Sequence, residues 1–163
     1  MIGIAEIKRI IPHRYPVLML DRVAELEPGR ALVAHKAITG REPCYAAIGD
    51  DAEPAQYAFP AGQLMESWAQ AAVLLVRWQT PNPDVRTGFV ELLSGIRNAS
   101  LLGQVFPGDV VEHRVELVRA VDDAAVVTGS SVVDGRLVLR VGSFTMARRG
   151  IEVLAAAADG SEG

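Results

Sequence analysis

Cysteine is almost absent from this chain, which has Cys44 as its one thiol among 163 residues. A single cysteine cannot form an intramolecular disulfide, and no cysteine or histidine stands beside it at the spacing of a metal site. We therefore expect neither a disulfide framework nor a structural metal. A lone free thiol is typical of a reducing compartment, so the sequence predicts a cytoplasmic protein.

A strong charge of either sign is absent too. The formal net charge is -4 at pH 7, and the chain has no basic stripe of the kind that nucleic-acid-binding proteins carry. Long hydrophobic runs are also missing, because the most apolar stretch, residues 64–76, is too short for a bilayer and contains Glu66, Ser67 and Gln70. The N-terminus lacks the organisation of a signal peptide. We expect no nucleic-acid partner and no membrane span.

The chain does have enough apolar sequence for one hydrophobic core. Half of its residues are hydrophobic and 22% are charged, as in ordinary soluble domains. The length suits a single domain, which we place at residues 1–150. The low-complexity sequence that follows predicts a flexible C-terminal tail over residues 151–163.

The N-terminal half predicts one long helix with short elements before it. Isoleucines at three- and four-residue spacing predict a short helix that ends before Pro12, and residues 13–23 indicate a turn followed by a buried strand. Residues 40–58 have no period and are expected to form a long loop. The long helix is expected from Pro60 to about Gln79, where prolines stop it.

The C-terminal half predicts strands only. Its β-branched runs are separated by turn sequences, and Asp134-Gly135 is a strong hairpin signal because both central residues of that turn need positive φ. One apolar helix followed by an antiparallel meander predicts an α+β domain in which the sheet wraps the helix.

Glu66 stands out in the expected helix, because the surrounding sequence YAFPAGQLMESWAQAA is otherwise apolar or small. An apolar wall disfavours the charged form of a carboxyl group, which suits a general acid that must hold a proton. Gln70 follows at i+4 on the same face, where its amide can hydrogen-bond Glu66 or a ligand. The residues alone leave open a second interpretation, in which Glu66 reaches a polar edge or pairs with a core arginine.

Several motifs together resemble a known family. The run IKRIIPHRYPVLMLDRVAELEPGR, the MESWAQAA helix and the later PGD, VELV and VDG segments resemble bacterial 3-hydroxyacyl-[acyl-carrier-protein] dehydratases over about residues 4–147. The resemblance implies a hotdog fold, in which two subunits pair with acyl tunnels at their interface. It also implies that a helix glutamate protonates the departing hydroxyl while a loop histidine from the other subunit removes the α-proton. Glu66 matches that acid, and Gln70 matches the glutamine that follows it.

The loop histidine of that family is missing here. Family members carry Gly-His-Phe-Pro before the helix. The most similar segment here is residues 57–60, YAFP, which has Ala58 at the histidine position. Counted without gaps from Glu66, the histidine position falls instead near Ala52. His13 belongs to the PHRYP run and is assigned to a turn. His35 and His113 fall in strand patterns, so we expect them at the surface or at the edge of the core.

A second departure concerns the carrier protein. The family usually has an arginine-rich stretch before the PGD turn, but residues 100–104 read SLLGQ here. Because acyl carrier proteins are acidic, the loss of these cations should weaken electrostatic steering. Arg97, Arg148 and Arg149 are the candidates to replace them.

The resemblance and its departures predict a degenerate dehydratase subunit, weak or inactive as a homodimer. A heterodimer with a histidine-bearing homologue would complete the site, and the substrate would be an acyl chain on the phosphopantetheine arm of acyl carrier protein, in fatty-acid or polyketide biosynthesis. Phe59, Met65, Trp68 and Tyr57 are candidates for lining the tunnel, although apolar residues at helical spacing are more often core. No cofactor is expected, because this elimination needs only an acid, a base and carbonyl polarisation.

Three other interpretations stay open. A loop residue, Asp50, Asp51, Glu53 or Tyr57, could replace the missing histidine as the base. Glu66 could instead be the general base of a hotdog acyl thioesterase. The chain could also be a non-catalytic acyl-binding or scaffold subunit.

Overall fold

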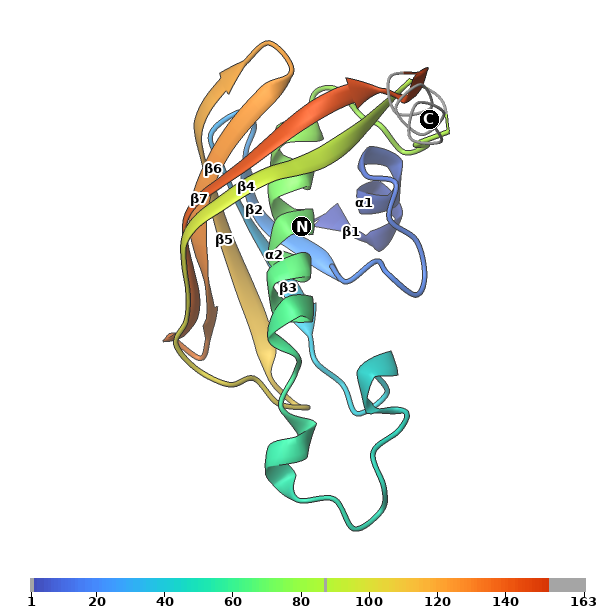
Figure 1. Cartoon of the computed structure of the whole chain (residues 1–163), viewed down its shortest axis with the longest axis vertical. Helices are drawn as coiled ribbons and strands as arrows, with labels where there is room; N and C mark the ends of the chain where they lie inside the picture. Colours follow the sequence, from blue (N-terminus) through green and yellow to red (C-terminus); the bar gives the residue numbers. More distant parts are fainter. Residues whose placement is uncertain (1, 87, 153–163) are drawn as a thin grey trace, which may run out of the picture.

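A long helix, α2 (Ala61–Arg77), lies in the concave face of a curved antiparallel sheet in the computed structural model (Figure 1). The structure describes residues 2–86 and 88–152, so most of the predicted tail over residues 151–163 lies outside the described residues. The α+β class and the helix wrapped by a sheet are both confirmed. No helix among the described residues has the length and apolar character needed to cross a membrane.

The remaining elements are short helices and strands. In chain order they are β1 (Ile2–Gly3), α1 (Ile4–Ile10), β2 (Arg22–Glu27), β3 (Ala31–Ala37), the 3-10 turns η1 (Pro43–Tyr45) and η2 (Pro54–Tyr57), β4 (Phe89–Leu101), β5 (Val110–Val121), β6 (Ala124–Val133) and β7 (Arg136–Gly150).

Helix α2 begins where the sequence predicts, after Pro60 in an extended conformation. Its buried face packs on the sheet through Trp68, whose ring lies edge-on to Phe144 at 5.6 Å and whose Nε1 donates to the Arg114 carbonyl. The sheet has Gly129 beneath this ring, where a Cβ would lie 3.1 Å from Trp68 Cζ2 and 2.0 Å from the Arg114 carbonyl oxygen of β5. The helix can approach the sheet this closely because glycine has no side chain.

The strands do not form the simple meander that the sequence suggested. Their order across the sheet is β1-β2-β3-β5-β6-β7-β4, so β4 crosses to the far edge and pairs with β7. Neighbouring strands in the sequence often pair, but β4 follows α2 and enters the sheet on its other side. The predicted hairpin between β6 and β7 is confirmed, with φ of 48° at Asp134 and 78° at Gly135.

The N-terminal segment differs from its prediction in one respect. Helix α1 ends before Pro12 as expected, but residues 13–21 form turns and irregular chain, and the strand that follows, β2, is largely exposed rather than buried. Only Val23 of that strand is fully buried. The α1 segment lies against the side of α2 that the sheet leaves uncovered (Figure 1).

Residues 40–58 form the expected long loop, which extends as an arm away from the rest of the chain (Figure 1). Its base is held by the nearly buried ion pair of Lys36 with Glu42, at 3.0 Å. Within the arm, the rings of Tyr45 and Tyr57 are in contact, with centroids 5.8 Å apart. Because residues 49–56 are mostly exposed, little of this chain packs against the tip of the arm.

His113 is fully buried, which corrects its expected place at the surface or core edge. Its Nε2 lies 2.9 Å from the Ser67 hydroxyl of α2, and its Nδ1 lies 2.8 Å from the Ser131 hydroxyl of β6. Burial lowers the pKa of His113 to about 3, so the ring is neutral at pH 7. The sequence hid this network, because its members come from three separate elements.

Candidate active site

One side of α2 and strands β4 and β7 enclose a cavity of about 230 Å³. Glu66, Gln70, Val73 and Arg77 line it from α2, because they recur at helical spacing along one face. Ala69 of α2 also borders the cavity, and the rest of the lining comes from the other elements around it: Pro12, His13, Asn82, Val85, Val90, Glu91, Leu92, Leu93, Phe144 and Met146. The cavity is therefore largely apolar, with polar groups at separate points.

Gln70 fixes the position of the Glu66 carboxyl group. Its Nε2 donates to Glu66 Oε1 at 2.8 Å and to the Val17 carbonyl at 2.8 Å, while its Oε1 accepts from the Met19 backbone N–H at 2.9 Å. The backbone partners determine which way the amide faces, because only its oxygen can accept from an N–H. Gln70 is 1% exposed, so the expected i+4 contact is present and rigid.

Glu66 itself is less buried than expected. Its side chain is 41% exposed in the single chain, and it does not pair with an arginine. The apolar wall predicted around it is therefore only partly present among the described residues.

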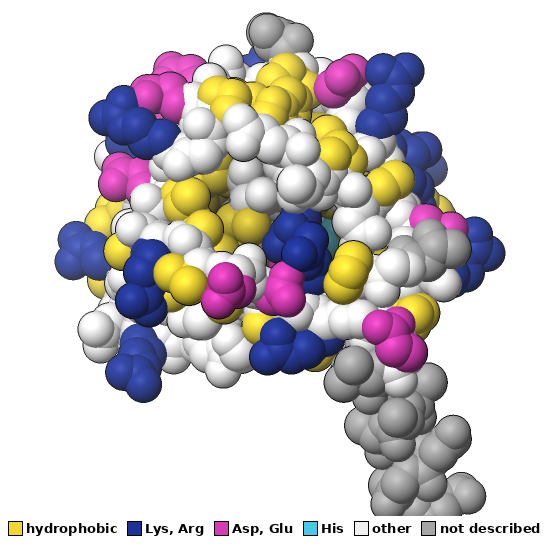
Figure 2. Space-filling view, turned by 90° about the horizontal axis from the view of Figure 1, so that it is seen from above, with side chains coloured by type: hydrophobic (Ala, Val, Ile, Leu, Met, Phe, Trp, Pro, Cys, Tyr) yellow, Lys and Arg dark blue, Asp and Glu magenta, His cyan; other side chains and the backbone are white. Residues whose placement is uncertain are grey.

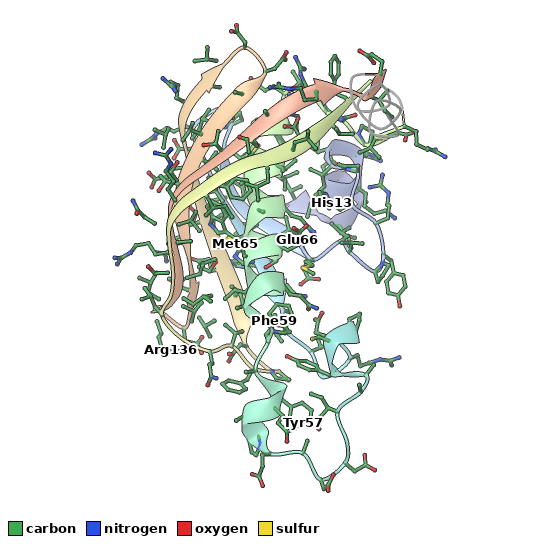
Figure 3. All side chains as sticks on the ribbon, viewed as in Figure 1. His13, Tyr57, Phe59, Met65, Glu66 and Arg136 are labelled. Carbon is green, nitrogen blue, oxygen red and sulfur yellow. The ribbon has the colours of Figure 1, made fainter. Side chains whose placement is uncertain are left out.

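His13 lies beside Glu66, with its Nε2 3.7 Å from Glu66 Oε1 (Figure 3). Its side chain is 25% exposed, and its Nδ1 is buried with no hydrogen bond to any described residue. Burial lowers the pKa of His13, an effect that the Glu66 charge opposes and that of Arg14 reinforces. The sequence assigned this histidine to a turn, and no spacing rule links residues so far apart along the chain.

The four residues suggested as tunnel lining do not border this cavity within the chain. Trp68 is fully buried in the core, so its role in this protomer is packing. Met65 packs partly buried against the core, and Phe59 is buried beneath the Lys36 ammonium group, 5.5 Å from the ring centroid. Tyr57 lies in the arm, far from Glu66 in Figure 3.

The acidic residues of the arm are also separate from Glu66 in this chain. Asp50, Asp51 and Glu53 are exposed, and none of them lines the cavity. Within the described residues, no group of three histidine, cysteine or acidic side chains is placed to hold a metal ion. A role for the arm would have to be at another protomer.

The far end of the cavity carries an ion pair that the sequence did not reveal. Arg77, at the end of α2, has its Nε 2.5 Å from Glu91 Oε1 of β4, and these side chains are only 11% and 10% exposed. The N–H of Arg77 Nε is not aimed at the carboxylate, so this contact is an ion pair and not a hydrogen bond. Arg77 does donate to the Thr80 hydroxyl at 3.1 Å.

Replacing Gln70 by methionine should destabilise the chain by about 1–3 kcal/mol, because two backbone groups lose their hydrogen-bond partner. Those groups are the Val17 carbonyl and the Met19 N–H. Urea unfolding measures the change, and Gln79→Met, at an exposed position just beyond α2, is the matched control. Equal stability of the two variants would show that the Gln70 network is dispensable.

Comparison with known proteins identifies the family of this chain. Residues 11–142 match the FabA-like domain family. A 3-hydroxyacyl-[acyl-carrier-protein] dehydratase, FabZ, of Campylobacter fetus is 34% identical over 141 residues, which cover 85% of this chain and 92% of the relative. The FabZ of Anaeromyxobacter dehalogenans is 36% identical over 138 residues, covering 85% of each chain.

Solved structures share the fold at lower sequence identity. The dehydratase heterocomplex ApeI:P from Xenorhabdus doucetiae matches with a TM-score of 0.69 and 15% identity, over 88% of this chain and 90% of the other. The PaaI protein of E. coli matches with a TM-score of 0.57 and 13% identity, over 77% and 81%. These likenesses support the hotdog fold, and the sequence matches carry the family assignment. The chain belongs to the FabA-like family and has a hotdog fold. FabZ-type 3-hydroxyacyl-[acyl-carrier-protein] dehydratases are similar to it over most of its length.

Proposed function

We propose that this chain is the acid-donating subunit of a 3-hydroxyacyl-thioester dehydratase. The observation that carries the proposal is the Glu66 carboxyl group, held by Gln70 at the wall of a largely apolar cavity in a FabA-like chain. Residues 40–60, where the family carries its histidine, contain none. The function therefore needs a proton acceptor from outside the chain's own loop.

The proposed reaction is a β-elimination. A base removes the α-proton of the acyl chain, that C–H electron pair forms the Cα–Cβ double bond, and the Cβ–O bond breaks. Glu66 gives its proton to the departing hydroxyl, which leaves as water. An acid at this position typically contributes about two to four orders of magnitude in rate.

We assign the base to a histidine of a homologous second chain. The free edge of β4 supports such pairing, because β4 pairs only with β7 and exposes apolar side chains, among them Phe89, Leu93 and Ile96. Figure 2 shows hydrophobic side chains at the surface of one end of the molecule, between arginines and carboxylates. The arm of residues 40–58 reaches away from its own chain, as a segment that packs on a partner would. The fold neighbour from Xenorhabdus is itself a heterocomplex.

His13 supports the role of Glu66 without replacing the partner's base. Burial lowers its pKa, so the imidazole beside Glu66 is neutral near pH 7. The neutral ring, with its Nε2 3.7 Å from Glu66 Oε1, therefore adds no positive charge to this side of the cavity.

The FabZ relatives are named for acyl-carrier-protein substrates, and we extend that substrate to this chain. Of the three arginines considered for carrier docking, Arg148 is bound to Asp123 at 2.9 Å. Arg97 and Arg149 are both exposed, and Arg149 donates to the Arg148 carbonyl at 2.8 Å. Arg97 and Arg149 are therefore the two candidates for steering an acidic carrier.

The test is to mix the purified chain with a histidine-bearing homologue and to follow hydration of an enoyl thioester by its absorbance. The rate should rise by about a hundredfold or more over the chain alone, and saturate at an equimolar ratio. No gain at that ratio would contradict the proposal. Release of free thiol in the same mixture would indicate the thioesterase alternative instead, because dehydration and hydration leave the thioester intact.

A further inference from the structure

One face of α2 links the cavity to a second hollow, a groove of about 230 Å³. Gln63 borders this groove, whereas Glu66 and Gln70 border the cavity. The three residues recur at three- and four-residue spacing, so they lie in a row along the helix. Glu66 follows Gln63 by about 4.5 Å along the helix axis, at 1.5 Å per residue. The groove therefore begins one turn before the carboxyl group.

The two hollows also share a second wall, the segment between α1 and β2. Pro12 and His13 border the cavity, and residues 16–19 border the groove. Gln70 holds this segment in place through two of its backbone groups. A ligand that passes Glu66 toward the start of α2 therefore leaves the cavity and enters the groove.

The groove is apolar apart from two polar side chains. Its lining consists of Pro16, Val17, Leu18, Met19, Glu42, Pro43 and Gln63. Glu42 Oε1 binds Lys36 Nζ at 3.0 Å, but Glu42 Oε2 has no hydrogen bond among the described residues. The Gln63 amide likewise has no partner in the described part of the chain. Neither group is completely buried, so both are open to a ligand.

These two side chains specify the chemistry of the ligand. A carboxylate oxygen can only accept a hydrogen bond, whereas a glutamine amide can donate and accept. A secondary amide matches both, because its N–H can donate to Glu42 while its carbonyl accepts from Gln63. The hydrocarbon on either side of such an amide suits the apolar walls. A purely hydrocarbon arm would cover both polar groups and leave them without partners, which is costly.

We infer that the groove binds the amide-bearing arm on which the acyl thioester is carried, and that Gln63 determines specificity for that arm. The inference rests on the proposed function, since it places the acyl chain in the cavity and the thioester at Glu66. It adds a site for the thiol side of the substrate within this chain. Thioesters of simple alkyl thiols are the disfavoured ligands.

The test measures binding of two butanoyl thioesters to the full chain by calorimetry. Neither has a 3-hydroxyl group to eliminate. One is carried on N-acetylcysteamine, which contains a secondary amide, and the other on 4-methylpentane-1-thiol, in which hydrocarbon of the same size replaces the amide. Gln63→Met should weaken binding of the amide-bearing ligand by about threefold to tenfold, as expected for one lost hydrogen bond. Binding of the alkyl ligand should change by less than about twofold.

Gln79→Met, at an exposed position just beyond α2, is the matched control and should leave both affinities unchanged. Gln63→Glu nearly keeps the size of the side chain but removes the amide donor. It should therefore weaken binding of the amide-bearing ligand in the same way if the methionine variant does not fold.

Three binding results would overturn the inference: equal weakening of both ligands by Gln63→Met, no weakening of either, or no binding of the amide-bearing ligand to the unchanged chain. Loss of the complex between the Gln63→Met chain and the histidine-bearing homologue would also overturn it, because the groove would then be a surface for the partner chain. Size-exclusion chromatography detects that loss.

This inference and the proposed function fail separately. Calorimetry needs no proton acceptor, so a negative binding result leaves the dehydration test with the partner chain standing. Conversely, the selective loss for the amide-bearing ligand together with no dehydration in the mixture would retain the arm site and reject the proposed reaction.

Discussion

Glu66→Gln should lower the dehydration rate of the mixed complex by about two to four orders of magnitude while leaving the complex assembled. The amide has nearly the shape of the carboxyl group and can still meet Gln70, but it cannot give up a proton to a departing hydroxyl. The measurement is the rate of enoyl formation at saturating substrate, with size-exclusion chromatography to confirm assembly. Because the change acts on the chemical step, kcat should fall more than KM rises.

Glu116→Gln is the matched control for that substitution. It makes the same chemical change on an exposed part of β5, away from the cavity, and should leave the rate within about twofold. If Glu66→Gln proved equally silent, Glu66 would have a structural role and the acid would have to lie elsewhere. A non-catalytic scaffold would then be the better description of the chain.

Acid should destabilise the fold through His113, and this is the largest stability effect that we expect. The folded chain holds His113 neutral with a pKa of about 3, whereas an ordinary histidine has a pKa of about 6.5. As the pH falls through this interval, His113 therefore binds a proton in the unfolded chain but stays unprotonated in the folded chain. The free energy of unfolding should fall between those two pH values by a total on the order of 4 kcal/mol from this group alone.

Urea unfolding over a range from about pH 7 to about pH 4 measures this loss. His113→Gln should be less stable near neutral pH, since it disturbs the contacts with Ser67 and Ser131, but its stability should depend less steeply on pH. A His113→Gln variant with the full wild-type slope would show that His113 is not the source of the acid sensitivity.

Local sequence patterns were enough to predict several features of the fold. Helix α2 was predicted almost to its ends because an apolar run lies between Pro60 and the later prolines, and the β6–β7 turn because Asp134-Gly135 suits positive φ. The placement of β4 was not predicted, since its partner β7 lies far along the sequence. Strand pairing of that range depends on how α2 directs the chain, which no local pattern encodes.

The same distinction holds for the site. The contact of Glu66 with Gln70 follows from i+4 spacing on one helix, and the structure has it. His13 beside Glu66 and the Arg77–Glu91 pair each join separate elements, so only the tertiary structure brings them together. The burial of Glu66 was the least accurate prediction. The apolar sequence around Glu66 predicted a buried carboxyl group, but the side chain is half-exposed in the single chain.

The family assignment makes the lack of a histidine in residues 40–60 significant for the proposed function. FabZ relatives cover most of the chain, and yet residues 40–60 contain no histidine to serve another subunit. The chain has Glu66, held by Gln70, at the wall of a largely apolar cavity. Under the proposed function, an acid without a base in the same chain is what division of labour between two homologous chains would produce.

A complementation assay tests that division most directly. This chain is mixed with a histidine-bearing homologue whose own helix glutamate has been replaced by glutamine, so that neither protein alone holds both an acid and a base. We predict that each protein alone is nearly inactive and that the mixture dehydrates a 3-hydroxyacyl thioester. An inactive mixture in which the complex has formed, or full activity of this chain alone, would contradict the account.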